Sequence, residues 1–134
     1  MKPEEALFGY LASMAEWESK CRDLYRERKA GRIEVSESMR AAMAIYNPIF
    51  EKYCSISKAV KRESLSFSSP PQYDVSSETI IAVNIIGIAV VEIRTNHATH
   101  DKQFVYRLTL ENGEWRLFEK FVIGSAGQLM RDEL

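Results

Sequence analysis

The chain has 134 residues, of which 46% are hydrophobic and 28% charged, and this composition suits one compact domain with its own core. Lys and Arg total 18 against 19 Asp and Glu, so the net charge is −1 and no overall field draws the protein onto nucleic acid or an anionic membrane. We therefore expect neither nucleic acid nor a membrane as a partner.

The N-terminal stretch has no feature of a targeting or membrane segment. Glu4, Glu5 and Glu16 interrupt its apolar residues, and no run in the chain approaches the ~20 apolar residues that a membrane-spanning helix needs. We expect a cytoplasmic protein whose two cysteines, Cys21 and Cys54, are reduced and pack as small buried hydrophobes.

Apolar residues at spacings of three and four predict a long amphipathic helix from Pro3 to about Lys29, ending near Gly31. Tyr10 and Trp17 lie on its apolar stripe, and stripes at helical spacing usually pack into the core. The first thirty residues therefore predict one helix with a buried side.

A second helix is predicted to open at Ser36 or Ser38 as the N-cap. Pro48 lies inside its apolar pattern and predicts a break or kink near Tyr46. Beyond the helix, three bases form a small cluster that we expect to be a solvated turn: Lys58, Lys61 and Arg62.

After Ser64 the apolar period changes to two. This alternation predicts four consecutive antiparallel strands over residues 78–86, 88–95, 103–110 and 114–123. Asn112-Gly113 is a strong signal for a tight hairpin, because both residues tolerate the positive φ of a type I′ turn. Ser64 to Phe67 is a candidate for a short additional first strand.

Helices followed by a strand meander predict an α+β domain, with the N-terminal helices packed on a strongly curved antiparallel sheet. We expect one domain over residues 1–134, with a helical part at 1–63, the sheet at 64–124 and a C-terminal tail at 125–134.

Two stretches carry a resemblance to a known family. The run FEKYCSISKAVKRESLSFSSPPQYD, residues 50–74, and the strand opening Gly-Glu-Trp-Arg, residues 113–116, are similar to bacterial immunity proteins of the nuclear transport factor 2-like fold. Val90-Val91-Glu92 and Tyr106-Arg107-Leu108 also fit the family's layout. The resemblance implies a cone-like fold and a protein of polymorphic toxin systems that binds a cognate toxin domain by occlusion, protecting the producing cell.

The Ser66–Asp74 stretch joins the helical part to the sheet. Its two prolines fix φ and stiffen the crossing, while Tyr73 can pack its ring with the hydroxyl in water and Asp74 can cap the next turn. We favour an architectural role for this loop, and a rigid docking surface for the toxin is the alternative.

The side chains that could act in catalysis or metal binding have simpler structural explanations. Glu92 and Arg94 share a strand face and are expected to form a surface ion pair. His97, His100 and Asp101 lie in a polar turn that we expect to be a solvated loop without a bound metal, since nothing is placed to orient the rings. No cofactor motif is present.

The leading hypothesis is therefore a non-enzymatic protein that contacts its toxin through five residues: Tyr73, Asp74, Glu92, Arg94 and Arg107. The first alternative is a small-molecule enzyme of the same fold, of the isomerase or dehydratase kind, using Glu92 or Glu119 with a tyrosine. The second is a non-catalytic ligand-binding or dimerisation domain. Formation of a homodimer is left open.

Overall fold

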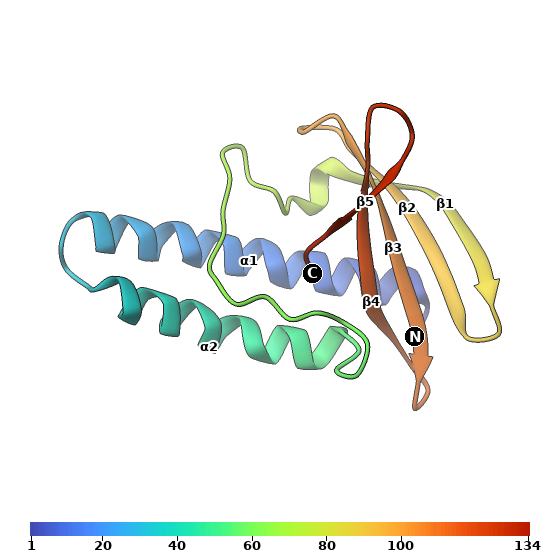
Figure 1. Cartoon of the computed structure of the whole chain (residues 1–134), viewed down its shortest axis with the longest axis horizontal. Helices are drawn as coiled ribbons and strands as arrows, with labels where there is room; N and C mark the ends of the chain where they lie inside the picture. Colours follow the sequence, from blue (N-terminus) through green and yellow to red (C-terminus); the bar gives the residue numbers. More distant parts are fainter.

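The computed structural model describes residues 1–134 as two helices followed by a five-stranded antiparallel sheet with strand order β1-β2-β3-β4-β5. The elements are α1 (Pro3–Lys29), α2 (Val35–Tyr53), the 3₁₀ turn η1 (Val75–Ser77), β1 (Glu78–Gly87), β2 (Val90–His97), β3 (Lys102–Glu111), β4 (Glu114–Ile123) and β5 (Leu129–Asp132). The two helices lie side by side against one face of the sheet and extend beyond it, which confirms the α+β class (Figure 1).

The first helix agrees with its sequence pattern. It ends at Lys29, and Gly31 then adopts a φ of +75°, a conformation that glycine tolerates without a Cβ clash. Trp17 is buried, and its indole Nε1 donates a hydrogen bond to the carbonyl of Ala42, 2.9 Å away in α2. Tyr10 is buried as well, so both aromatic residues belong to the core as predicted.

The second helix departs from its predicted start and from the predicted break at Pro48. It begins at Val35 after Glu34, and the Ser38 hydroxyl donates back to the carbonyl of Val35 instead of capping the helix. It also continues through Pro48 without a break. Pro48 and Ala44 both lie on the exposed side, so water can satisfy the Ala44 carbonyl that lacks a partner N–H.

The four predicted strands are all present, and the turn between β3 and β4 has its predicted geometry. Asn112 and Gly113 have φ values of 52° and 79°, as a type I′ hairpin requires. One register shift falls after Arg107 in the β3–β4 pair, and two interrupt the β1–β2 pair. No helix of the structure combines the length and the apolar character that crossing a bilayer demands.

Two expectations about the strands are wrong. Ser64–Phe67 forms no strand, and Phe67 instead packs its ring 5.2 Å from the ring of Tyr25 on α1. Residues 129–132, expected as part of a tail, form β5 and pair with β4 in the register Lys120↔Asp132 to Ile123↔Leu129. The sheet therefore has a C-terminal strand that brings new charged residues to its edge.

The core lies between the helices and the covered face of the sheet. Both cysteines are free and buried there, as predicted, and burial raises the pKa of the Cys54 thiol to about 12. A thiol with so high a pKa carries almost no thiolate at neutral pH, so Cys54 is a packing residue and not a nucleophile.

The proline-rich loop is held against α1 by a single buried carboxylate. Glu18 accepts main-chain hydrogen bonds from Ser68, Gln72 and Tyr73 at 2.8–2.9 Å. Arg22, one turn further along, donates to the carbonyl of Ser68 at 2.9 Å. These contacts account for the loop's course without a partner, which supports the architectural reading.

Glu18→Gln should destabilise the protein by about 1–3 kcal/mol, because an amide offers one acceptor oxygen and leaves at least one of the three buried N–H groups unpaired. Urea unfolding followed by circular dichroism measures the effect. Glu16→Gln, at an exposed position of the same helix, is the control and should change stability little. Equal losses in the two variants would mean that Glu18 does not hold the loop.

Candidate functional site

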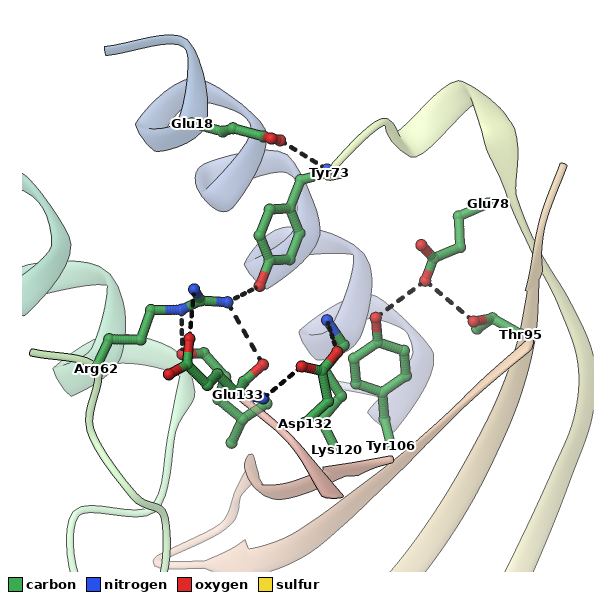
Figure 2. A network of polar contacts seen from close by, with 10 residues as sticks. Glu18, Arg62, Tyr73, Glu78, Thr95, Tyr106, Lys120, Asp132 and Glu133 are labelled. Atoms are coloured by element: carbon green, nitrogen blue, oxygen red, sulfur yellow. Dashed lines mark hydrogen bonds and ion pairs between the residues drawn. The ribbon is translucent and has the colours of Figure 1, made fainter. Parts of the chain in front are cut away.

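A network of polar contacts lies beside the hydrophobic core, between the helices and the covered face of the sheet (Figure 2). Its first centre is Arg62, which is only 5% exposed. The guanidinium donates to the Tyr73 hydroxyl, to the main-chain oxygen of Leu134 at 2.6 Å and to the Glu133 carboxylate at 3.1 Å. The expectation that Arg62 belongs to a solvated basic turn is wrong, because the loop after α2 turns this side chain inward.

The second centre is Lys120 on β4, which is 1% exposed. Its ammonium lies 3.2 Å from the Asp132 carboxylate on β5. The same nitrogen lies 5.0 Å from the ring centroid of Tyr73 and 4.7 Å from that of Phe104, within cation–π range. Aromatic faces and one carboxylate thus replace the water that a buried ammonium loses.

The third centre is Glu78 at the start of β1, a buried acid. Its Oε2 accepts hydrogen bonds from the Thr95 hydroxyl at 3.0 Å and the Tyr106 hydroxyl at 3.2 Å. Burial raises the pKa of Glu78 above its ordinary value of 4.5, although the two hydroxyl groups and nearby Lys120 act in the opposite direction. Burial likewise raises the pKa of Tyr106.

An acid beside a phenol is the combination that an acid–base enzyme of this fold would need, so the space around Glu78 matters. Neither Glu78 nor Tyr106 lines any of five surface hollows of the molecule. One of these hollows, of about 230 Å³, is lined by Arg62, Lys120 and C-terminal residues, and both of these cations already have carboxylate partners. The acid and the phenol therefore contact each other and not one of these hollows.

The opposite face of the sheet, which we call the outward face, carries a row of alternating charges. Arg107 on β3 contacts Glu92 on β2 at 3.1 Å and Glu119 on β4 at 3.2 Å. Glu119 in turn contacts Arg131 on β5 at 2.7 Å. The Phe121 ring lies under both guanidinium groups, 4.8 Å from that of Arg107 and 5.7 Å from that of Arg131.

This row crosses four strands and holds its side chains in fixed positions. Arg94 lies on the same face, because it alternates with buried Ile93 and Thr95, and it is exposed with no carboxylate within ion-pair distance. The predicted Glu92–Arg94 pair is therefore wrong: Glu92 pairs across the sheet with Arg107, its register partner. Three of the five predicted contact residues, Glu92, Arg94 and Arg107, do lie together on the outward face.

The other two lie elsewhere. Tyr73 is buried, and its hydroxyl accepts from Arg62, so the expectation that this hydroxyl stays in water is wrong. Asp74 accepts from the main-chain N–H and hydroxyl of Ser76 and from the hydroxyl of Ser77, which confirms it as the cap of the next turn. These hydrogen bonds hold the pKa of Asp74 below its ordinary value of 3.8.

The histidines differ in environment. His97 ends β2 and is buried, with its ring 4.9 Å from that of His100 and 6.4 Å from that of Phe104. It is therefore a packed residue and not part of a solvated loop. The structure contains no group of three or more His, Cys, Asp or Glu side chains placed to hold a metal ion.

The structure separates the acids and the tyrosines that the enzyme hypothesis requires. Glu92 and Glu119 share one arginine on the outward face, whereas Tyr10, Tyr46, Tyr73 and Tyr106 are buried on the helix side. The sheet separates these two acids from those four phenols. No acid–base pair forms from them.

Sequence patterns missed the interior charges. Glu18, Arg62, Glu78 and Lys120 are all buried, yet each falls where the sequence favours a solvent-facing residue. A weak signal exists for Lys120: it lies two residues before Val122, which packs against the core, so the two side chains share a strand face. For Arg62, no local pattern predicts burial, because its partners lie 11 to 72 residues away.

Two N-terminal helices on one face of a five-stranded antiparallel sheet define a small α+β domain of the nuclear transport factor 2-like class. A family model described as NTF2 fold immunity protein matches residues 2–126. The chain belongs to this family. No curated protein and no solved structure matches it.

Glu78→Gln tests the interior acid through pH. Because the folded-state pKa of Glu78 is raised, wild-type stability relative to the glutamine variant should be highest below pH 4.5 and should fall as pH rises through the folded-state pKa. Urea unfolding of both proteins at a series of pH values from 4 to 8 measures the gap. A gap that moves in favour of wild type with rising pH would mean that Lys120 holds Glu78 ionised.

Proposed function

We propose that this protein binds a cognate toxin domain and blocks it by occlusion, in the cell that produces the toxin. The observation that carries the proposal is the family match over residues 2–126, which covers nearly the whole chain. The geometry supports a binding role, because the interior acid Glu78 is hydrogen-bonded to Tyr106 and the outward acids Glu92 and Glu119 are paired with Arg107. The protein is a partner in this proposal and not a catalyst.

The outward face is our candidate for the toxin-contacting surface. It lies opposite the helices and presents Arg94 together with the row Glu92, Arg107, Glu119 and Arg131. Because each charged group in the row has a neighbour of opposite charge and both arginines lie over the Phe121 ring, little side-chain entropy remains to be lost on binding. Fixed charges of both signs favour a partner of complementary pattern and disfavour others.

Tyr73 and Asp74 enter the proposal as residues that support the loop from within. Their polar groups are occupied by Arg62 and by the two serines, so they are poorly placed to meet a partner directly. The contact surface then consists of Glu92, Arg94 and Arg107, with Glu119 and Arg131 completing the row.

Co-expression with the toxin domain encoded beside this gene tests the function, with growth rescue and co-purification as readouts. Arg94→Glu should weaken toxin binding at least roughly tenfold and leave stability unchanged, because it reverses a charge at an exposed position without an ion-pair partner. Arg40→Glu, an exposed position on α2, is the matched control. If wild type neither rescues growth nor co-purifies, toxin neutralisation is excluded; if Arg94→Glu binds like the control, another surface is used.

Tyr73→Phe separates architecture from contact. Removing the hydroxyl that accepts from buried Arg62 should lower the free energy of unfolding by about 1–3 kcal/mol. Toxin affinity, measured by calorimetry well below the melting temperature, should stay within about twofold of wild type. A large loss of affinity with little loss of stability would mean that Tyr73 contacts the toxin directly.

A further inference from the structure

The first strand of the sheet exposes apolar side chains that the rest of the molecule leaves uncovered. We define the β1 strip as the exposed hydrophobic residues of β1 and its following turn: Ile81, Val83, Ile85, Ile86 and Ile88. Ile85 is 82% exposed, and residues 79–88 contain no charged side chain. Elsewhere, exposed apolar residues such as Ile56 and Val60 are flanked by polar or charged neighbours.

β1 is also a free edge of the sheet, and its main chain beyond β2 has no neighbouring strand (Figure 1). Sheet edges are usually protected by short strands, by charges or by proline. The opposite edge, β5, follows this rule with four residues that include Arg131 and Asp132. β1 has ten residues and neither lysine nor proline, and its two bulges leave Ala82–Ile85 in regular register.

Two members of the strip lie on the covered face of the sheet and yet are exposed. Val83 and Ile85 are register partners of Ile93 and Val91, which are both buried in the core. Directly opposite residues of paired strands share a face, so the helices that cover β2 do not reach this part of β1. The strip is therefore an extension of the hydrophobic core that the molecule itself leaves uncovered.

We propose that the β1 strip is where two copies of this protein associate, with β1 of one copy pairing antiparallel to β1 of the other across a two-fold axis. In such a contact residue i of one copy meets residue j of the other and j meets i, so the two strips cover each other along their length. Because residues 79–88 contain no charged side chain, the contact buries no unpaired charge.

The size of the strip fits a second copy. The transfer free energy of a whole Val or Ile side chain is proportional to its apolar area. On this scale the exposed parts of the strip amount to on the order of 400 Å² of apolar surface. Stable interfaces bury ~800 Å² per partner, of which somewhat more than half is apolar. The strip thus supplies most of the apolar share, and the strand's main chain and flanking polar groups supply the rest.

Sedimentation and light scattering of the full chain over micromolar concentrations test the proposal. Wild type should be a dimer, and Ile85→Lys should raise the dimer dissociation constant at least roughly 100-fold, because each copy would place an ammonium group without a counter-charge in the apolar contact. Ile56→Lys, which changes an isoleucine that is 70% exposed outside the strip, should stay dimeric. Circular dichroism and thermal melting of each monomeric variant establish that its fold is intact.

Mixing two oppositely charged variants distinguishes self-association through the strip from other causes of a change in oligomeric state. Ile85→Lys and Ile85→Glu should each be monomeric and should form a mixed dimer when combined, since the contact then holds charges of opposite sign instead of like charges. A wild-type monomer, a dimeric Ile85→Lys variant or the absence of a mixed dimer would overturn the proposal. If wild type is monomeric and Ile85→Lys fails to bind the toxin domain, the strip contacts the toxin instead. The dimer does not depend on toxin neutralisation, so either proposal can fail alone.

Discussion

The structure depends on the neutralisation of one buried cation, Arg62. A guanidinium taken out of water is costly unless its hydrogen bonds are made and its charge is balanced. Arg62 meets this condition by joining segments far apart in the chain: its side chain contacts Tyr73 and the last two residues, its main-chain N–H donates to the Tyr46 hydroxyl, and its guanidinium lies 5.4 Å from the Trp17 ring centroid. Both helices, the proline-rich loop and the C-terminal strand are thereby fixed to one another. Hydrophobic packing alone would not fix these segments relative to one another, because Arg62 lies in a loop without regular secondary structure.

The interior and the outward face use the same residue types for different purposes. Inside, Glu18, Arg62 and Lys120 are shielded from water and hold elements together, so each is tied to a geometry that the fold cannot vary. Outside, the row through Arg107 lies where water screens it, so its contribution to stability is small and its contribution to recognition can be large. This division means that the charges of the outward face can be changed at little cost to stability, whereas those of the interior cannot.

The elements were largely predictable and the site only in part. Periodicity of 3.6 and 2 gave the helices and four strands, and Asn112-Gly113 gave the hairpin, because these signals are local. β5 was missed because four residues are too few for a pattern, and they pair only because β4 offers an edge. Glu92 and Arg107 were predicted among the contact residues, but their pairing follows from strand register, which no single strand specifies. The inward turn of Arg62 and Tyr73 depends on partners at long sequence separation, which lies beyond any local pattern.

The late position of Asp132 and Glu133 has a consequence for biosynthesis. During translation, Arg62 emerges from the ribosome well before Glu133, the carboxylate that contacts it, which lies 71 residues later. Until that acid is available, closing the helices onto the sheet would bury a guanidinium without this counter-charge, at a cost of several kcal/mol. The helices should therefore close onto the sheet only after residues 132 and 133 have left the ribosome.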